Sequence, residues 1–424
     1  MSPGPARIVC LDLDTFFVSV ERLLDPTLEG KPVIVGGRPG GRGVVTACSY
    51  EVREHGVRSG ISLTEASRLA PHAVYLPTRH GVYGEYAEKV RAIAEGYTPE
   101  SRVASIDEMY LDFRGCDGVY REPGDADGDA TIERVVRGIT ARVRAELGLP
   151  ASCGIASSKV VAKVASGLAK PAGVLLVPSG AEPGFLGPLP VRKLPGIGPV
   201  AADKLTRAGF LTLGDVARAP LPELRAIFGA WAEVIHRNVN GMGAADLGRD
   251  RPAFREHDPE GESIGSISNE RTFMEDVSDP RQIEDRLCSL TERVCWRARK
   301  RGVKARTVTL KLRYADFRTL TRGKTIWPTC SEYEVFPVVM DLYRAARTRR
   351  GIRVRLLGLK LSNLGFYDEQ LELFERKERL HGAVDAIRAR WGFEAVRSAA
   401  AVRGGSRPAR EGRRIDPRAR STER

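Results

Sequence analysis

The amino-acid sequence predicts a multidomain protein in which an α/β unit is followed by a helical unit and an α+β unit. Three observations support this fold class. Strand and helix patterns alternate over residues 1–175, short helical patterns broken by Pro and Gly continue to residue 242, and a strictly alternating basic strand follows residue 305. The 424 residues suffice for two to four domains, and 42% apolar with 29% charged residues is typical of a folded globular protein.

The α/β unit begins with an apolar strand over residues 8–11, which leads into Asp12, Leu13 and Asp14 and then into a helical pattern over 16–24. The next two strands flank a glycine-rich loop without a Walker lysine, so a hairpin connection is a better interpretation than a phosphate cradle. A helical pattern over 49–69 is broken by Gly56 and Gly60. The remaining patterns are helices over 85–97, 133–147 and 159–169 and strands over 103–113, 152–156 and 173–177.

The second half of the chain changes character at residue 188. A turn formed by residues 195–198 precedes a helix over 200–208, and the Gly, Pro and charge content of 243–261 predicts a linker. An amphipathic helix is expected over 281–300. The strand over 306–314 alternates, with an apolar face of Val308, Leu310, Leu312 and Tyr314 and a polar face of Thr307, Thr309, Lys311 and Arg313.

The formal net charge of +13 is concentrated in two segments. Residues 1–252 hold 30 basic and 29 acidic residues, whereas 253–366 hold 23 and 15 and 403–424 hold 8 and 3. Within the second segment, residues 293–324 carry twelve basic residues and one acid. Such a concentration indicates a surface that binds a polyanion. Residues 403–424 lack aromatic residues and are expected to be disordered.

Membrane, secreted and zinc-binding classes are not favoured. The longest uncharged apolar runs fall far short of the ~20 residues that span a bilayer, and the N-terminus has no apolar signal region. We therefore expect a cytoplasmic protein without a membrane partner. The seven cysteines form no C-x-x-C pair and are expected to be reduced and mostly buried.

Three carboxylates are candidates for a metal site. Asp12 lies at a strand end, and Asp107 and Glu108 occur 95 residues later within a strand-like run, where adjacent acids are costly to bury without a neutralising charge. Oxygen ligands without His or Cys favour magnesium or manganese bound together with substrate phosphates. Two such ions roughly 3.5–4 Å apart can promote phosphoryl transfer. Scattered acids are common, so spacing alone leaves chance as an alternative.

Three sequence blocks together resemble the Y-family of translesion DNA polymerases. They are residues 8–14 followed by Phe16 and Phe17, residues 47–53, and residues 105–112. The turn at 194–198 and the segment 370–374 extend the resemblance toward the DNA polymerase IV branch of that family, and the resemblance covers residues 7–398. It implies a right-hand fold with palm, small fingers, helical thumb and little-finger domains.

The resemblance also implies domain boundaries. They are palm 1–20 and 76–173, fingers 21–75, thumb with a helix-hairpin-helix 174–242, linker 243–260, little finger 261–366, clamp-binding peptide 367–374, helical extension 375–402 and basic tail 403–424.

Asp12, Asp107 and Glu108 correspond to the family's catalytic carboxylates, which bind two Mg²⁺ ions that Mn²⁺ can replace. The resemblance adds the Leu13 carbonyl as a ligand and places Glu108 beside the primer 3′-hydroxyl. Asp14 and Asp112 match no ligand position and are expected to form structural hydrogen bonds or helix caps.

Nucleotide contacts are implied for a further group. Phe16 and Phe17 correspond to residues beside the nucleotide, and Phe17 to the steric gate that excludes a ribose; a core residue of an amphipathic helix is its alternative role. Tyr50, Arg53 and Lys170 correspond to a triphosphate clamp, whose chemistry suits phosphate. Val44 and Thr46 would face the nascent base pair, while Ala47 and Ser49 depart from the family pattern.

The implied DNA contacts lie in the thumb and little finger. Backbone N–H groups at Gly196 and Gly198 would bind a phosphate, and Thr309, Lys311 and Arg313 would hold duplex DNA independently of sequence. Gln370, Leu373 and Phe374 resemble a sliding-clamp peptide.

The implied function is template-directed addition of deoxynucleotides to a primer by a monomer, with low fidelity and without proofreading. An inactive relative that serves as a DNA- or clamp-binding scaffold is the alternative. A nucleotidyl cyclase, which can share a two-metal sheet, has no use for the basic strand or the hairpin turn.

Overall fold

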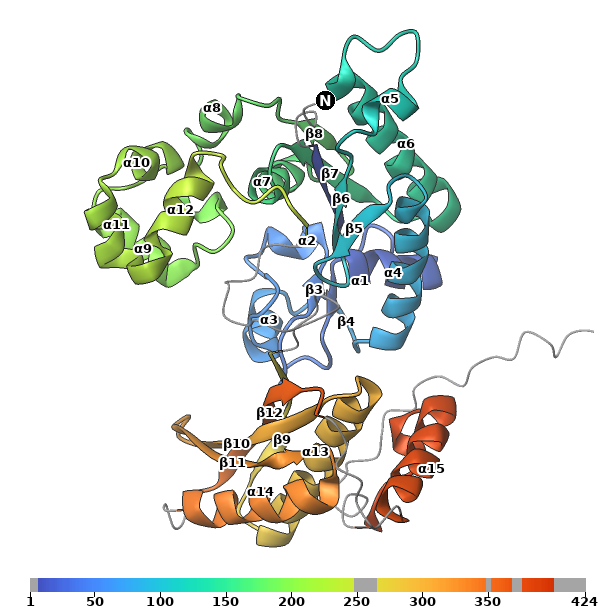
Figure 1. Cartoon of the computed structure of the whole chain (residues 1–424), viewed down its shortest axis with the longest axis vertical. Helices are drawn as coiled ribbons and strands as arrows, with labels where there is room; N and C mark the ends of the chain where they lie inside the picture. Colours follow the sequence, from blue (N-terminus) through green and yellow to red (C-terminus); the bar gives the residue numbers. More distant parts are fainter. Residues whose placement is uncertain (1–6, 248–264, 348–351, 368–375, 400–424) are drawn as a thin grey trace, which may run out of the picture. The chain divides into compact units, whose positions relative to one another are not determined.

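The computed structural model describes residues 7–247, 265–347, 352–367 and 376–399, with side chains from residue 380 in the last range. The chain divides into two compact units, Met1–Phe254 and Arg255–Arg424 (Figure 1). The clamp-peptide residues Gln370, Leu373 and Phe374, the basic tail and most of the expected linker lie outside the described residues. Within the described part of the chain, no helix has the length and apolarity needed to cross a bilayer.

The palm is a five-stranded sheet in the order β5-β6-β1-β7-β8. Its strands are β1 Ile8–Leu13, β5 Glu100–Val103, β6 Glu108–Asp112, β7 Ala151–Ala156 and β8 Val174–Leu176. β1 is central and pairs antiparallel with both β6 and β7. Strands buried on both faces are apolar throughout, which explains the continuous apolar run at the start of β1.

Helices cover both faces of this sheet (Figure 1). Val9, Leu11 and Leu13 pack in one core with α4 (His80–Glu95) and α6 (Gly128–Leu147). Ile8 and Cys10 pack in another with α7 (Lys159–Ala169). Because side chains alternate along a strand, Asp12 lies on the α7 face.

The fingers contain a three-stranded sheet in the order β3-β2-β4, formed by β3 Ala47–Cys48, β2 Val33–Val35 and β4 Val74–Leu76. Helix α1 (Phe16–Leu24) and the short helix η1 (Pro26–Leu28) lead into them. The break expected at Gly56 and Gly60 in the helical pattern over 49–69 is confirmed, since α2 (Tyr50–Arg53) and α3 (Leu63–Leu69) are separate helices. Gly56 and Gly60 between them have φ of 84° and 92°, a left-handed conformation that ends a helix.

The thumb is helical, as expected. Its elements are α8 Glu182–Leu186, η2 Val191–Lys193, α9 Pro199–Arg207, α10 Leu213–Arg218, α11 Leu221–Phe228, η3 Gly229–Trp231 and α12 Ala232–Val239. The palm also contains the short helix α5 (Asp117–Tyr120), which lies between β6 and α6 in the chain.

The chain after the thumb returns to the palm, which differs from the linker expected to begin at residue 243. The Lys159 backbone N–H donates to the Ala244 carbonyl at 3.1 Å, and its Nζ to the Asp246 carbonyl at 2.9 Å. Arg114 donates to the Ala245 carbonyl at 3.1 Å, and Leu247 is buried. Residues 243–247 are therefore held on the palm by contacts distant in sequence.

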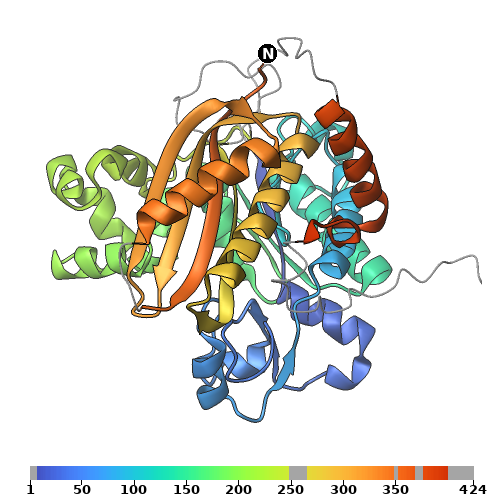
Figure 2. The same cartoon turned by 90° about the horizontal axis from the view of Figure 1, so that it is seen from below.

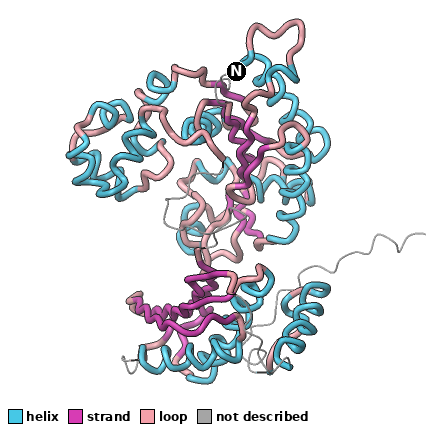
Figure 3. Tube along the Cα trace, viewed as in Figure 1, coloured by secondary structure: helices cyan, strands magenta, loops and turns pink. Residues whose placement is uncertain are grey.

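The second unit contains a four-stranded antiparallel sheet in the order β11-β10-β12-β9. The strands are β9 Ser266–Val277, β10 Lys304–Tyr314, β11 Thr319–Thr329 and β12 Val354–Gly365, and helices α13 (Pro280–Lys300) and α14 (Glu332–Ala346) cover one face (Figure 2). The alternation expected for β10 is confirmed, since Val308, Leu310, Leu312 and Tyr314 are buried. Figure 3 shows the strands of both units in magenta.

Helix α15 (Arg376–Trp391) and the short helix η4 (Phe393–Ala395) pack against α13. Arg299 on α13 forms an ion pair with Asp385 at 2.7 Å. The Phe393 ring lies between two guanidinium groups, Arg293 at 4.3 Å and Arg388 at 4.5 Å from its centroid. A helical extension at this position was expected, and these polar contacts attach it to the second unit.

Candidate active site

The three candidate carboxylates gather at one end of the palm sheet. Asp12 on β1 is directly opposite Glu108 on β6. Asp107 precedes β6, and its backbone carbonyl accepts a hydrogen bond from the Leu13 N–H at 2.8 Å. The sheet register therefore brings together residues that are 95 positions apart in the sequence.

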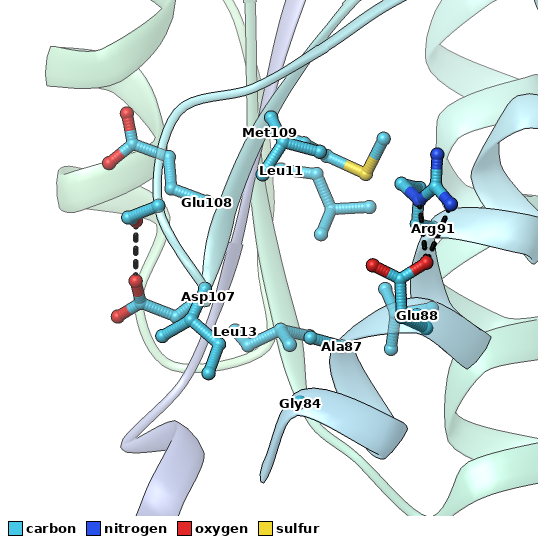
Figure 4. A pocket seen from close by; sticks show the side chains of 13 residues that line it. Leu11, Leu13, Gly84, Ala87, Glu88, Arg91, Asp107, Glu108 and Met109 are labelled. Carbon is cyan, nitrogen blue, oxygen red and sulfur yellow. Dashed lines mark hydrogen bonds and ion pairs between the residues drawn. The ribbon is translucent and has the colours of Figure 1, made fainter. Parts of the chain in front are cut away.

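Asp107 and Glu108 are among the residues that line a pocket beside β6, although their carboxylates project to one side of the strand. Figure 4 shows the Asp107 and Glu108 carboxylates on one side of the strand and Leu11 and Met109 on the other. The apolar side lines a cavity of about 150 Å³ against α4. The Asp107 carboxylate accepts a hydrogen bond from Ser105 Oγ at 2.6 Å, so the loop before β6 holds it in place.

Two lysines from one helix neutralise the other two carboxylates. Lys170, which caps the C-terminus of α7, donates to Asp12 at 2.5 Å. Lys163 forms an ion pair with Glu108. Lys163 was not predicted from the sequence, although its spacing of seven residues from Lys170 corresponds to about two helical turns and places both on one face.

Burial and charge control the protonation of this site. Burial raises the pKa of the Asp12 carboxyl above its ordinary value, and the Lys170 ammonium opposes that shift. Burial would lower the pKa of Lys170, but the charges of Asp12 and Asp14 outweigh it, so that pKa is raised overall. The site therefore favours a positive charge beside Asp12.

The donor atoms fit a hard divalent cation. Asp12, Asp107 and Glu108 supply carboxylate oxygens, and no His or Cys is among them, which suits Mg²⁺ or Mn²⁺. Within the residues that the structure describes, no three His, Cys, Asp or Glu side chains converge into a complete cluster. In this structure each carboxylate instead contacts Ser105, Lys163 or Lys170.

Phe16 and Phe17 begin α1, next to this site. Phe16 is buried in the palm core, whereas Phe17 is partly buried and stacks on Tyr83 with 4.1 Å between ring centroids. The Tyr83 hydroxyl donates to the buried Glu21 carboxylate at 2.5 Å, and Arg79 also binds that carboxylate. This network was missed because nothing in the local sequence pairs Glu21 with residues about sixty positions away.

Tyr50 and Arg53 lie on α2 and contact each other. The Arg53 guanidinium is 4.7 Å from the Tyr50 ring centroid. The Nε atom of Arg53 is buried and has no hydrogen-bond partner among the described residues. Burial raises the pKa of Tyr50, with a further increase from Asp14 and an opposing effect from Lys170, which places these groups within electrostatic reach of one another. Lys170 thus contacts Asp12 directly, while Tyr50 and Arg53 contact each other on α2.

Other polar residues near the site have structural partners. Asp14 is buried and accepts hydrogen bonds from Ser152 Oγ at 2.8 Å and the Ala172 N–H at 2.7 Å. At the far end of β6, Asp112 accepts from the Arg114 N–H at 2.8 Å. Both observations agree with the structural roles expected for Asp14 and Asp112.

Two polar residues of the segment 44–49 form hydrogen bonds within the fingers. Ser49 Oγ accepts a hydrogen bond from the Val33 N–H at 3.0 Å. Thr46 donates to the Val35 carbonyl at 2.8 Å, while Val44 is 50% exposed. Ala47 lies in β3 and is partly buried. The Ser49 hydroxyl therefore holds the fingers sheet together.

Of the expected DNA contacts, Gly196 and Gly198 are exposed, whereas Thr309, Lys311 and Arg313 are partly buried. Gly196 adopts φ of 93°, and Gly198 caps the N-terminus of α9. On the polar face of β10, Lys311 pairs with Glu270 at 2.8 Å and Arg313 donates to Thr319 at 2.8 Å. Thr309 shares this face, which α13 and α14 leave open.

Models of one protein family match three parts of this chain. The impB/mucB/samB family model matches residues 11–167, its C-terminal domain residues 265–373, and the HHH motif of the same family residues 179–210. The second match ends at residue 373, one residue before the end of the expected clamp-peptide segment, and the third includes the hairpin turn. The first range corresponds to the palm and fingers, the second to the little finger and the third to the thumb.

Known relatives support the same assignment. DNA polymerase IV of Dehalococcoides mccartyi strain 195 is 39% identical over 396 residues, which cover 92% of this chain and 96% of the relative. DNA polymerase IV of Streptomyces coelicolor is 38% identical over 366 residues, covering 86% and 72%.

Solved structures agree with the fold. A Y-family DNA polymerase chimera, Dbh-Dpo4(243-245)-Dbh, has a TM-score of 0.71 at 25% identity and covers 85% of this chain and all of its own. DinB from Sulfolobus solfataricus has a TM-score of 0.54 at 26% identity, covering 84% and 98%.

The palm fold with its carboxylates, the thumb and the basic second unit define a nucleic-acid polymerase of the right-hand class. The chain belongs to the impB/mucB/samB family, the Y-family of DNA polymerases. Within that family it is a DNA-directed translesion polymerase of the DNA polymerase IV type. The family and fold expected from the sequence are confirmed.

Proposed function

We propose that the site at the end of β1 and β6 performs template-directed extension of a primer with two Mg²⁺ ions. The observation that carries this proposal is the register that places Asp12 opposite Glu108, with Asp107 beside them. Together with the Leu13 carbonyl, these residues would hold the ions. When bound, the ions activate the primer hydroxyl and stabilise the leaving pyrophosphate, and Mn²⁺ can replace them.

The nucleotide lies on the fingers side in this proposal. Tyr50, Arg53 and Lys170 hold the triphosphate, and the buried Arg53 Nε supplies an N–H that has no other acceptor among the described residues. Phe17 excludes ribonucleotides by contact at the sugar, and Phe16 supports it from the core. An exposed Val44 leaves room beside the base pair, which is compatible with low fidelity and lesion bypass.

Primer-template DNA is held by the thumb and the second unit. Backbone N–H groups of Gly196 and Gly198 bind a phosphate, and Thr309, Lys311 and Arg313 contact the duplex. A solved Dbh DNA polymerase structure is an insertion ternary complex, so a similar fold accommodates substrates. Gln370, Leu373 and Phe374 would bind a sliding clamp. The protein acts as a cytoplasmic monomer without a proofreading site.

The decisive experiment is primer extension with Mg²⁺ by wild type, Asp107→Asn and Glu108→Gln. Both variants should lose at least about 10³-fold in rate, since metal ligands act on the transition state. Primer-template affinity should change little. Glu88→Gln, an exposed carboxylate change on α4, is the matched control and should extend normally. If wild type binds DNA but extends nothing, the chain is a DNA-binding scaffold instead.

A further inference from the structure

Several guanidinium groups gather along the seam between helix α13 and β9, the last strand of the sheet in the second unit. Three of them are on α13 at a spacing of seven and four residues, which places them on one flank of the helix. Arg271 of β9 is opposite the buried Leu357, so its side chain lies on the helix-covered face of the sheet. We call this group the arginine seam: Arg271, Arg286, Arg293, Arg297 and Arg397.

Aromatic rings and backbone atoms orient these guanidinium groups. The Arg286 guanidinium lies 5.3 Å from the centroid of the Phe273 ring on β9. Arg297 donates a hydrogen bond to the Ser268 carbonyl of the same strand at 3.2 Å. A guanidinium has five N–H donors, so a single contact of this kind leaves donors for an anion.

The positive charges of the arginine seam are crowded. Burial lowers the pKa of Arg286, and the charges of Arg271 and Arg397 lower it further. Burial also lowers the pKa of Arg293, with an opposing effect from Glu394 and a further decrease from the neighbouring arginines. An added anion therefore relieves repulsion among these groups.

One carboxylate of the chain already lies among these arginines. Glu394 of η4 forms ion pairs with Arg293 and, at 3.1 Å, with Arg397. The rings beside the arginine seam, Phe273 and Phe393, are only 7% and 6% exposed, so they offer little surface on which a nucleic-acid base could stack. These contacts favour the carboxylates of a peptide over a single-stranded nucleic acid.

The spacing of the row suits an extended chain. With a helical rise of 1.5 Å per residue, Arg286 and Arg293 are about 10 Å apart along α13, and Arg293 and Arg297 about 6 Å. Alternate residues of an extended peptide are about 7 Å apart and point to the same side. Carboxylates at alternate positions of such a peptide therefore reach successive arginines.

We propose that the arginine seam is a docking surface for an extended acidic segment of a partner protein. Carboxylates of that segment form charge-assisted hydrogen bonds with the guanidinium groups, some of them bidentate. The arginine seam lies on the helix-covered face of the sheet, whereas Lys311 and Arg313 lie on its open face. Docking is therefore independent of primer extension, and DNA and the partner can be bound together.

The experiment titrates the full chain against a fluorescein-labelled peptide of alternating Glu and Ser and follows its anisotropy at low salt. Wild type should bind this peptide but not the counterpart with Gln in place of Glu. Arg271→Gln combined with Arg297→Gln should weaken binding several-fold; both arginines are exposed, so the core stays intact. Arg344→Gln, which changes an exposed arginine of α14, is the matched control and should bind like wild type.

Glu394→Gln provides a change of opposite sign. It removes the carboxylate that Arg293 and Arg397 share, so the peptide should bind more tightly. Unlabelled primer-template DNA should leave the peptide bound, because DNA and peptide use different faces of the sheet. The inference is overturned by equal binding of the Gln peptide, by wild-type affinity of the double arginine variant, or by displacement of the peptide by DNA, which would make the arginine seam a nucleic-acid surface.

Discussion

Strand alternation places Asp12 and Glu108 on the same face of the palm sheet. Along β1, Val9, Leu11 and Leu13 face the helices α4 and α6, so Asp12 faces α7. Glu108 has the same orientation on β6 because it pairs with Asp12. A shift of one residue in either strand would turn its carboxylate into the apolar core.

Phe17 permits a prediction at the residue scale. Phe17→Leu should increase ribonucleotide incorporation, because the smaller side chain leaves room for a 2′-hydroxyl. Loss of its stacking on Tyr83 should also lower the free energy of unfolding by roughly 1 kcal/mol. The measurement is the ratio of kcat/KM values for ribo- and deoxynucleotides.

Phe113→Leu is the control for Phe17→Leu, since Phe113 is fully buried in the same core but belongs to the end of the sheet remote from the carboxylates. It should reduce stability without changing sugar selection. If Phe17→Leu leaves sugar selection unchanged, Phe17 is a core residue only.

At the scale of elements, α7 determines where Lys163 and Lys170 lie. The distance between α7 and the palm sheet depends on Gly154 of β7. A Cβ atom added to Gly154 would lie 2.0 Å from the Ala162 carbonyl oxygen. Helix and strand are therefore in direct backbone contact at this point. A displacement of α7 would move Lys163 and Lys170 together.

Gly154→Ala should lower the free energy of unfolding by about 3 kcal/mol or more, because backbone atoms cannot move aside without shifting α7. Urea unfolding of the full chain measures this effect. Gly138→Ala on α6 is the matched control, since its Cβ would meet nothing within 4 Å and Ala favours a helix by about 1 kcal/mol. Equal stability of the two variants would contradict close packing at Gly154.

At the scale of the whole molecule, the excess of basic residues lies outside residues 1–252. Residues 1–252 carry almost balanced charge, with 30 basic and 29 acidic residues, whereas 253–366 carry 23 and 15. The polar face of β10 concentrates part of this excess beside threonines, on the sheet face that α13 and α14 do not cover. Nonspecific DNA affinity is thus expected to reside mainly in the second unit.

Combined replacement of Lys311 and Arg313 by Ala should weaken primer-template binding and reduce its salt slope by about 1.8, the value for two phosphate contacts. The extension rate at saturating DNA should be largely retained. Arg344→Ala, which removes an exposed arginine from α14, is the control and should not alter the slope. Anisotropy titrations at several salt concentrations provide the measurement.

Deletion of residues 370–374 tests the proposed clamp peptide. Stimulation of synthesis by a sliding clamp should be lost, while synthesis without the clamp should remain at its wild-type rate. A variant with the same five residues in scrambled order controls for segment length. Stimulation that survives the deletion would place the clamp contact elsewhere.

The sequence by itself determined the family, the order of elements and the three carboxylates, because these depend on local patterns and motif spacing. It also predicted the buried face of β10, since alternation follows directly from strand geometry. It also marked Gly56 and Gly60 as breaks in the helical pattern over 49–69, and the structure has separate helices, α2 and α3, on either side of them.

Only the tertiary structure decided which charged side chains contact each other. Lys163 with Glu108, Glu21 with Arg79 and Tyr83, and residues 243–247 with the palm are contacts between distant parts of the chain. A sequence pattern describes one element at a time, whereas sheet register and helix packing determine which elements share a site. The packing of α7 on the palm sheet is what brings Lys163 to Glu108.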